Sequence, residues 1–308
     1  MAAHVIDGNL LASQLRETID EELQVLRMSA VTPGLATIMV GEEADATAYE
    51  RHVRRLAEGL EYHYVSERLP EDVEIADVLA TIGKVNADPR VTGVLVLRPL
   101  PAHLDEAVIN ATVDPRKDIE GQHPENAGLL ALGRPRFVPS TPASCFYLLD
   151  SYARSTGVDP SEFYVGKTLV VVGRSTSVGK PAMWLGLERH ATVLAAHSRT
   201  AASGRLAEAT LQADILIVAA GQPGLVTGDM VCEGVVAVDV GFHTIVYPET
   251  GKTSFVGDLD FDSVAVKAEA ITPVPGGVGP ITDVWLVGNT LVAAALSVQV
   301  EPRFGSIV

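Results

Sequence analysis

The sequence has little cysteine, few aromatic residues and no long uninterrupted apolar run. Its 308 residues include 2 cysteines, Cys145 and Cys232. Their separation fits no metal-ligand motif, and two thiols form no disulfide framework. We interpret both as small buried hydrophobic side chains rather than reactive thiols. The sequence therefore predicts no metal site.

The apolar runs are short, and this limits where the protein can reside. The longest of them, such as 168–172 and 235–240, have the length of a strand. None approaches the about 18 residues that a membrane helix needs. The first residues show no basic segment followed by a long apolar stretch. We expect a cytoplasmic protein that binds no membrane.

Basic residues are scarce relative to acidic ones. Lys and Arg number 23 against 39 Asp and Glu, which gives a net charge of −16. Such a charge repels the phosphate backbone, so we expect no nucleic-acid partner. A small anionic ligand needs only a local cluster of positive groups, and the net charge does not exclude it.

The rest of the composition is ordinary for a globular protein, with 47% hydrophobic and 20% charged residues. In the first third of the chain, strands alternate with helices, which indicates a parallel sheet covered on both faces. Helical spacing or apolar character predicts helices at 10–28, 47–60 and 75–86 and strands at 34–40, 62–68 and 93–97.

A second α/β pattern begins after a Pro-, Gly- and Asn-rich stretch at 98–144. It predicts strands at 167–172, 191–195, 215–219 and 236–240. It predicts helices at 145–155 and 201–212, and a third helix that follows the glycine-containing turn after Val172 and ends at about 189. The final predicted helix, 282–298, returns to the first domain. We therefore predict two α/β domains, 1–144 with 281–308, and 145–280 as a Rossmann-type domain.

A glycine-containing turn follows the buried strand that ends at Val172. The order strand, tight turn and helix N-terminus is typical of a dinucleotide site, where backbone N–H groups bind the pyrophosphate. The turn departs from the usual three-glycine pattern, so it is also compatible with a plain strand–helix connection. Its candidate cofactor-binding residues are Gly173, Arg174, Ser175, Ser177, Val178 and Gly179.

The residues after the next strand favour a dinucleotide. His197, Ser198, Arg199 and Thr200 stand where an adenosine ribose would lie. An acidic residue there would bind the free 2′-hydroxyl of NAD, whereas Ser198 and Arg199 suit a 2′-phosphate. A polar loop with a chance arginine is the alternative. We favour NADP, with Arg174 nearby.

An ordered set of motifs now resembles the methylenetetrahydrofolate dehydrogenase/cyclohydrolase family over nearly the whole chain. The motifs are Val40-Gly41, Tyr49, Asn86-Ala-Asp88, Arg98-Pro-Leu-Pro101, Lys117-Asp-Ile-Glu-Gly121, Asn126-Ala-Gly128, Pro139-Ser-Thr-Pro142, Gly173–Pro181, His197–Thr200, Asp214-Ile215, Ala220-Gly221, Asp239-Val-Gly241, Gly257-Asp258 and Thr272–Thr282.

The resemblance implies a folate cleft between the two domains, with NADP bound on the C-terminal one and a homodimer formed through that domain. The family oxidises 5,10-methylenetetrahydrofolate by hydride transfer, and water then opens the methenyl product to 10-formyltetrahydrofolate. The resemblance adds Ala220, Gly221, Asp239 and Gly241 to the candidate cofactor-binding residues. It assigns the substrate to Tyr49, Glu120 and the segment Pro275, Gly276, Gly277, Val278, Gly279 and Pro280.

The sequence departs from the family pattern at three active-site positions. Val53 stands at the position of the lysine that supports hydrolysis, and Leu97 at that of the glutamine that orients it. Glu120 replaces the aspartate that contacts the pterin ring. Glu120 still accepts hydrogen bonds from an aminopyrimidine, but its extra methylene shifts the ring unless the pocket is reshaped, so a modified folate remains an alternative substrate.

These changes affect the two reactions unequally. Hydride transfer needs two partners held face to face, whereas attack of water needs a group that carries a proton. We therefore predict a dehydrogenase with weak or lost cyclohydrolase activity. The alternatives are a fully bifunctional enzyme in which Arg54, Arg55 or Arg98 replaces the lysine, a silent paralogue that binds folate or NADP, and a dehydrogenase for a different substrate.

Overall fold

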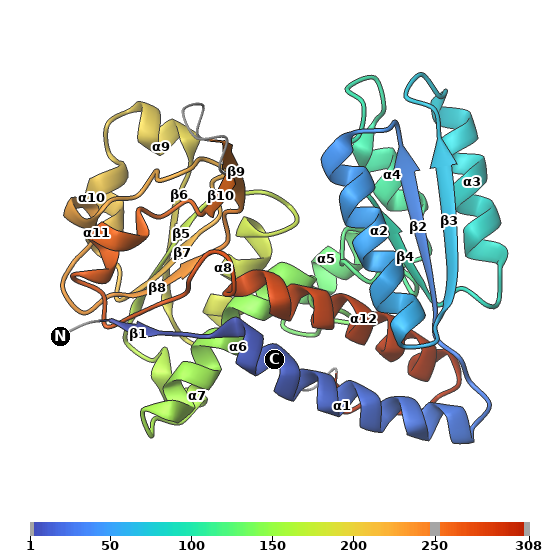
Figure 1. Ribbon diagram of the computed structural model, residues 1–308, viewed down its shortest axis with the longest axis horizontal. Coiled ribbons are helices and arrows are strands. Elements are labelled where there is room, and N and C mark those ends of the chain that lie inside the picture. Colours follow the sequence, from blue (N-terminus) through green and yellow to red (C-terminus); the bar gives the residue numbers. More distant parts are fainter. Residues whose placement is uncertain (1–2, 247–252, 305–308) are drawn as a thin grey trace. The chain divides into compact units, whose positions relative to one another are not determined.

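The computed structural model describes residues 3–246 and 253–304. The chain divides into two compact units, Leu15–Ser140 with Asp283–Val308 and Met1–Gln14 with Thr141–Thr282. We call them the three-stranded unit and the six-stranded unit, after their main sheets (Figure 1).

The three-stranded unit contains a parallel sheet in the order β3-β2-β4. Its strands are β2 (Gly34–Val40), β3 (His63–Leu69) and β4 (Gly93–Val96). The helices α2 (Ala44–Gly59), α3 (Ile75–Ala87), α4 (Glu106–Thr112) and α5 (Pro124–Ala131) belong to this unit, together with most of α1 (Gly8–Met28) and of α12 (Val278–Ser297).

The central strand β2 is buried along its whole length because both faces of the sheet are covered. Ala36, Ile38 and Val40 belong to an apolar cluster with α3 and α4. The alternate side chains point to the other face, where the Thr37 hydroxyl contacts the Tyr64 hydroxyl and Met39 contacts Thr47 of α2. The sheet thus fixes α2 on one face and α3 with α4 on the other.

The six-stranded unit contains a parallel sheet in the order β1-β11-β8-β7-β5-β6. Its strands are β1 (His4–Val5), β5 (Thr168–Val172), β6 (Thr192–Ala196), β7 (Ile215–Val218), β8 (Val236–Asp239) and β11 (Ala270–Ile271). A separate antiparallel pair joins β9 (His243–Val246) to β10 (Thr253–Val256). The helical elements are α6 (Ser140–Ser155), α7 (Pro160–Phe163), α8 (Gly179–Glu188), α9 (Ser198–Ala202), α10 (Leu206–Thr210), η1 (Gly228–Met230) and α11 (Phe261–Ala265).

The strand order reverses at β5, because β6 pairs with one edge of it and β7 with the other. In open α/β sheets, ligands bind beside the carboxyl ends of the strands at such a point. One face of the sheet packs on α10, η1 and α11. Gly186 lets α8 approach the other face, since a Cβ there would lie 2.4 Å from Leu169.

The structure confirms the two-domain α/β class and changes several details. Residues 1–14 cluster with the six-stranded unit, whereas we assigned them to the first domain, because β1 pairs with β11. The predicted helix 201–212 is two helices, α9 and α10, because Gly204 between them has φ +72°. The short strands β1, β9, β10 and β11 had no apolar pattern long enough to be noticed.

The last helix also begins earlier than the sequence predicts. The predicted start was Thr282, but α12 begins at Val278, because Pro280 lies in its first turn, where proline is tolerated. Among the described residues α12 has the length and composition to cross a membrane, but 78% of the relevant window is buried inside the protein. It is the core helix of a folded unit.

Candidate functional site

The candidate cofactor site lies at the carboxyl ends of β5 and β6. These neighbouring parallel strands pair Val172 with Ala196, so the glycine turn and the His197–Thr200 segment leave the sheet at the same level. The Gly173 N–H donates to the Ala196 carbonyl at 2.8 Å. The pairing brings together two groups of cofactor residues that the sequence predicted separately.

The turn requires its two glycines for steric reasons. Gly173 has φ +140°, and a Cβ at this residue would lie 2.3 Å from the Ala219 carbonyl oxygen. A Cβ at Gly179 would lie 2.4 Å from the Gly173 carbonyl oxygen. The backbone therefore folds back tightly on itself before α8 begins.

Ser175 organises the start of α8. Its hydroxyl accepts from the N–H groups of Val178 at 3.1 Å and Gly179 at 3.3 Å, and it lies 3.4 Å from the hydroxyl of Ser177. These N–H groups lie at the N-terminal end of the helix, where the helix dipole favours an anion. The arrangement offers polar groups to a phosphate.

Two exposed arginines flank this turn. Arg174 follows β5, and Arg199 lies in the first turn of α9, which follows β6. His197 caps that helix, because its Nδ1 accepts from the Arg199 N–H at 3.2 Å and its own N–H donates to the Thr200 hydroxyl at 3.2 Å. The cap fixes the backbone of Ser198 and Arg199 at the edge of the sheet.

Two buried aspartates hold the loops that follow β7 and β8. Asp258 accepts from the N–H groups of Ala220 at 2.6 Å, Gly221 at 2.9 Å and Gln222 at 2.8 Å. Asp239 accepts from the N–H groups of Gly241, Asp258 and Leu259, each at 2.9 Å. Because the Asp239 carboxylate accepts these three backbone hydrogen bonds, it shapes the loop that follows β8.

Burial also changes the acidity of Asp239. Burial raises its pKa to about 6, although the three backbone N–H groups oppose the rise. The sequence identified the motif Gly257-Asp258 only as part of the family resemblance, and its structural role as the partner of the Ala220–Gln222 loop is visible only in the structure.

The predicted substrate segment Pro275–Pro280 belongs to the six-stranded unit, whereas Tyr49 and Glu120 belong to the other unit. Gly276 has φ +102°, and its carbonyl accepts from the Gly8 N–H at 2.8 Å. A Cβ at Gly277 would lie 2.6 Å from the Pro273 carbonyl oxygen. Gly276 and Gly277 thus allow the chain to turn and pack closely before α12 begins.

In the three-stranded unit, α2 presents Tyr49 with 38% of the residue exposed. Val53, one helical turn later, is 0% exposed, and Leu97 after β4 is 3% exposed. The positions of the family lysine and glutamine are therefore part of the apolar interior. Desolvation by burial raises the pKa of Tyr49, and the charges of Glu120 and Asp283 add to the rise.

Glu120 is fixed by the residues on either side of it. Asp118 accepts from the N–H groups of Gln122 at 3.0 Å and His123 at 2.8 Å, which closes the turn around Gly121. The Asn289 amide of α12 donates to the Ile119 carbonyl at 2.8 Å. These bonds set the direction of the backbone at Glu120.

The carboxyl group of Glu120 contacts the hydroxyl of Ser140. Burial raises the pKa of Glu120 to about 7, the nearby charge of Asp118 adds to the rise, and the hydrogen bonds from Ser140 oppose it. A carboxyl group in this range exchanges a proton near neutral pH, and it both accepts and donates hydrogen bonds.

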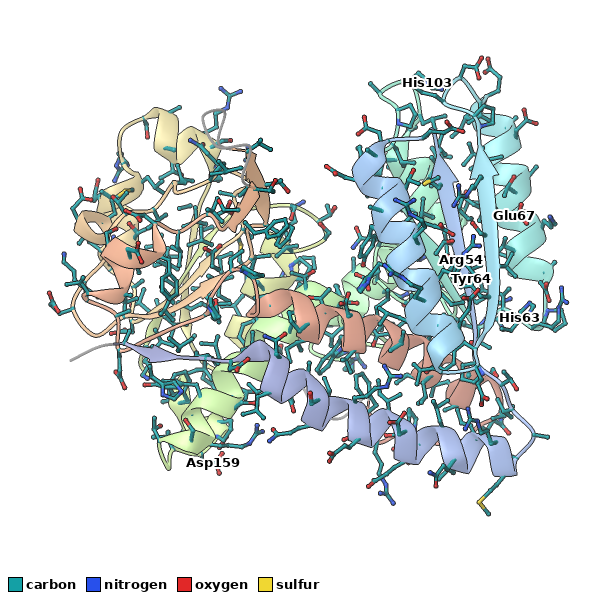
Figure 2. The ribbon with its side chains drawn as sticks, viewed as in Figure 1. Arg54, His63, Tyr64, Glu67, His103 and Asp159 are labelled. Atoms are coloured by element: carbon teal, nitrogen blue, oxygen red, sulfur yellow. The ribbon has the colours of Figure 1, made fainter. Side chains whose placement is uncertain are left out.

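The arginines considered as substitutes for the lysine have other partners. Arg54 donates to the buried carboxylate of Glu50 at 2.9 Å and lies over the ring of Tyr64 at 5.3 Å, and Figure 2 shows Arg54 and Tyr64 close together. Arg98 donates to Glu106 at 2.6 Å and to Asn110 at 2.6 Å. Arg55 is exposed and donates to the Arg51 carbonyl of its own helix at 3.3 Å.

Sequence reasoning missed a histidine–aspartate pair beside Tyr49. His52 lies three residues after Tyr49 on α2, and its Nε2 is 2.7 Å from Oδ2 of Asp283 on α12. Two signals were available in the sequence: a histidine at helical spacing from the tyrosine, and an aspartate directly after the Thr272–Thr282 motif. Their contact spans 231 positions, so only the folded chain reveals it.

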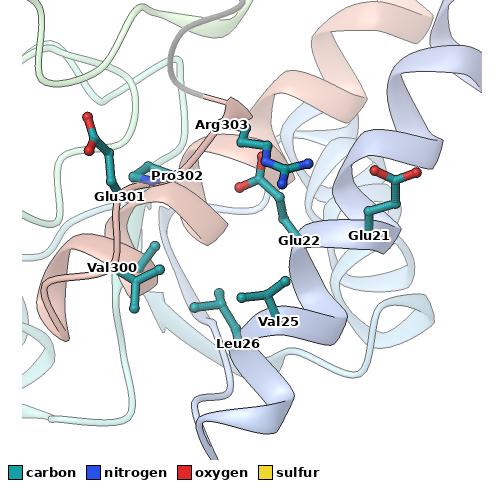
Figure 3. A pocket seen from close by; sticks show the side chains of 9 residues that line it. Glu21, Glu22, Val25, Leu26, Val300, Glu301, Pro302 and Arg303 are labelled. Carbon is teal, nitrogen blue, oxygen red and sulfur yellow. The ribbon is translucent and has the colours of Figure 1, made fainter.

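A pocket beside the C-terminal half of α1 is formed by contacts that serve the fold. It lies between Glu22 on α1 and the segment Val300–Arg303 after α12 (Figure 3). The Glu22 carboxylate accepts from the Phe304 N–H at 2.6 Å, and Phe304 packs on Trp285 with ring centroids 4.9 Å apart. These contacts hold Phe304 against α1 and α12, and none of the residues that line the pocket is a predicted site residue.

Comparison with known proteins identifies a family. Residues 139–298 match the tetrahydrofolate dehydrogenase/cyclohydrolase NAD(P)-binding domain, and residues 6–120 match the catalytic domain of the same family. These matches cover most of the chain. The chain belongs to the tetrahydrofolate dehydrogenase/cyclohydrolase family, and its C-terminal region is an NAD(P)-binding domain.

Relatives match over nearly the whole chain. Bifunctional protein FolD 3 of Rubrobacter xylanophilus is 57% identical over 98% of this chain and 96% of its own length, and bifunctional protein FolD of Moorella thermoacetica is 42% identical over 96% and 99%. The bifunctional FolD structure from Campylobacter jejuni has a TM-score of 0.87 at 36% identity, covering 96% of this chain and all of that one. A Trypanosoma brucei FolD, complexed with NADP cofactor and inhibitor, has a TM-score of 0.87 at 33% identity, covering 97% and 99%.

Proposed function

We propose that the chain is an NADP-dependent 5,10-methylenetetrahydrofolate dehydrogenase whose cyclohydrolase step is slower than that of a lysine-containing relative. The observation that supports it is a contrast between the two predicted sites. The glycine turn between β5 and α8 retains its close backbone packing. Val53 and Leu97 fill the positions of the lysine and glutamine with buried apolar side chains.

The residues at the edge of the six-stranded sheet suit a 2′-phosphorylated dinucleotide. When bound, NADP accepts the hydride from the substrate. Ser175 and the N–H groups at the start of α8 would bind the pyrophosphate. Arg199, Ser198 and Arg174 are exposed at adjacent strand ends, where they would bind the 2′-phosphate.

The residues beside Tyr49 suit the pterin. Glu120 would accept hydrogen bonds from the aminopyrimidine, as the family's aspartate does, and Ser140 holds its carboxyl group in place. Tyr49 presents an aromatic ring and a protonated hydroxyl beside it. Hydride transfer requires only that the substrate be held and oriented, and these groups serve that need.

The relatives named as bifunctional support a second candidate, the complete dehydrogenase/cyclohydrolase. Their identity of 57% and 42% extends over nearly the whole chain. The specific observation that favours it here is the His52–Asp283 pair, which offers a proton-carrying group close to Tyr49.

One assay separates the candidates. Purified protein receives methylenetetrahydrofolate with NADP⁺ or NAD⁺, and the absorbances of reduced cofactor and of the methenyl product are followed together. We expect reduced cofactor with NADP⁺ and a methenyl product that accumulates before it decays. Methenyl lost as fast as it forms would instead establish the bifunctional enzyme. The absence of reduced cofactor would instead support a silent binding protein or a dehydrogenase for a different substrate.

We further propose a homodimer formed through the six-stranded unit. Phe242 and Phe255 stack at the β9–β10 pair with ring centroids 5.0 Å apart, and both are largely exposed, as is Val246. Exposed apolar clusters of this kind are typical of interfaces. Light scattering is expected to give twice the mass of the chain, and Phe242→Ser to shift the equilibrium toward the monomer.

A further inference from the structure

The pair formed by His52 and Asp283 has no role in the dehydrogenase proposed above. The two side chains lie 2.7 Å apart, and 40% of the histidine and 27% of the aspartate side chain are exposed. We infer that this pair transfers the proton in hydrolysis of the methenyl-folate, in place of the missing lysine. The inference rests on the proposed function, because it requires a folate bound beside Tyr49.

The geometry of α2 places His52 next to Tyr49. A helix turns about 100° per residue, so the side chains of Val53 and His52 lie about 40° and 60° from that of Tyr49, on opposite sides of it. Val53 is buried, whereas His52 is open to water. The family lysine and His52 of this chain would therefore lie on opposite sides of the tyrosine, but on the same face of the helix.

Asp283 connects the pair to the rest of the site. It is the first residue after the Thr272–Thr282 motif, and α12 brings it to His52. Tyr49 lies one helical turn before His52 on α2, and the charges of Glu120 and Asp283 both contribute to the raised pKa of Tyr49. Burial raises the pKa of Asp283, and the hydrogen bond with His52 opposes that rise.

A second histidine–aspartate pair shows what a structural pair looks like in this protein. His243 contacts Asp258 at 2.7 Å, but the Asp258 carboxylate is fully buried and also accepts from three backbone N–H groups. Those bonds hold a loop. The His52–Asp283 pair is instead accessible to water, and His52 lies one helical turn after Tyr49 on α2.

The pair has the arrangement that general base catalysis requires. With Asp283 ionised, Nε2 of neutral His52 donates its hydrogen to the carboxylate, and the lone pair of the ring then lies on Nδ1. A carboxylate that holds an imidazole in one tautomer is the usual way in which proteins prepare such a base.

The proposed step is balanced as follows. Water attacks the methenyl carbon and forms a C–O bond, while one water proton passes to Nδ1 of His52. The bond between that carbon and N5 then breaks as the remaining hydroxyl proton leaves and the formyl C=O forms. N5 receives a proton from the imidazolium, which regenerates neutral His52. The products are 10-formyltetrahydrofolate and one released proton.

The test supplies methenyltetrahydrofolate directly to the full-length protein and follows the loss of its absorbance. The variants are His52→Ala and His52→Gln, with the dehydrogenase rate of each protein as an internal measure of folding and folate binding. Glutamine retains a hydrogen bond to Asp283 but carries no proton between groups, so it separates a structural role from proton transfer. Arg55→Gln, on the exposed side of α2, is the matched control.

We expect the wild type to hydrolyse the substrate faster than buffer does. Hydrolysis by both His52 variants should fall by about 10²-fold, the lower end of the 10²–10⁴-fold typical of general acid–base catalysis, while hydride transfer changes less than about twofold. Added imidazole should restore hydrolysis in His52→Ala and leave hydride transfer unchanged.

Three results would overturn the inference. They are wild-type hydrolysis at the buffer rate, full hydrolysis by His52→Gln, or equal losses of hydrolysis and hydride transfer in both variants. Failure of the proposed function would be seen in a separate assay. In that case the wild type would form no reduced cofactor from methylenetetrahydrofolate.

Discussion

The edge of the six-stranded sheet and the Tyr49 face of α2 are built from different parts of the chain. At the sheet edge, Gly173 and Gly179 pack backbone against backbone, and Asp239 and Asp258 hold loops through backbone N–H groups. On α2, the proposed chemistry depends on the side chains of Tyr49, His52 and Val53, together with Glu120 and Asp283 from other segments.

This difference explains why one site keeps its motif and the other does not. A site made of backbone tolerates few substitutions, because each Cβ or lost turn disturbs several hydrogen bonds at once. A site made of side chains changes its chemistry by single substitutions that leave the fold intact. Val53 and Leu97 are such changes, since both simply join the apolar interior.

Gly173→Ala tests the backbone site and should have the largest effect. The new Cβ would lie 2.3 Å from the Ala219 carbonyl oxygen at a φ of +140°, so the turn cannot keep its shape. We expect loss of measurable NADP binding and a destabilisation of more than about 1 kcal/mol. Calorimetric titration and urea unfolding measure the two effects.

Gly83→Ala in α3 is the control for that substitution. Nothing lies within 4 Å of a Cβ built at Gly83, and its φ is not positive. Alanine there should leave binding unchanged and stabilise the protein by up to about 1 kcal/mol. Equal losses in both variants would contradict the distinction between the two glycines.

Val53→Lys with Leu97→Gln tests whether the side-chain site can be converted. If the lysine reaches the face of Tyr49, hydrolysis of methenyltetrahydrofolate should rise by about 10²-fold, because general acid–base assistance is worth about 10²–10⁴-fold. Hydride transfer should change little. Because Val53 is 0% exposed, the variant should also unfold at lower urea concentration. Unchanged hydrolysis in a folded variant would show that lysine is not what limits the reaction.

Arg199→Ala should change cofactor preference by a smaller factor. Removing a charged donor to the 2′-phosphate costs about 1.5–3 kcal/mol, which is about a 10–100-fold rise in KM for NADP⁺. KM for NAD⁺ should stay nearly constant, because NAD⁺ has no such phosphate. Arg205→Ala is the control, since Arg205 is exposed and pairs with Glu208 at 2.9 Å. A parallel rise for both cofactors would remove Arg199 from phosphate recognition.

Glu120→Gln should produce the smallest effect, a change in how stability depends on pH. The pKa of Glu120 is raised from 4.5 to about 7, so between these pH values the folded state holds more protons than the unfolded state. Stability from this group is therefore present below pH 4.5 and is lost as pH rises through 7. Urea unfolding at pH 5 and pH 7.5 should show a smaller loss in Glu120→Gln than in the wild type, and equal losses would refute the assignment.

Much of the fold could be predicted because its signals are local. The strands β2 and β4 are mostly apolar and begin at a glycine, and α3 has helical periodicity, so the sequence predicts these elements within one or two residues. The break between α9 and α10 was missed because Gly204 resembles a tolerated helical glycine until its φ of +72° is known. Strands of two residues, such as β1, have no local pattern at all.

The sequence by itself determined the family and the cofactor turn, because the glycine turn and the Thr272–Thr282 motif are contiguous, and steric limits on a backbone are visible in consecutive residues. Only the tertiary structure decided which side chains surround Tyr49. In the folded chain Val53 and Leu97 are buried, and His52 contacts an aspartate 231 positions away. Arg54 pairs with Glu50, and Arg98 pairs with Glu106. Such contacts depend on where whole helices pack, and packing joins residues that no local pattern relates.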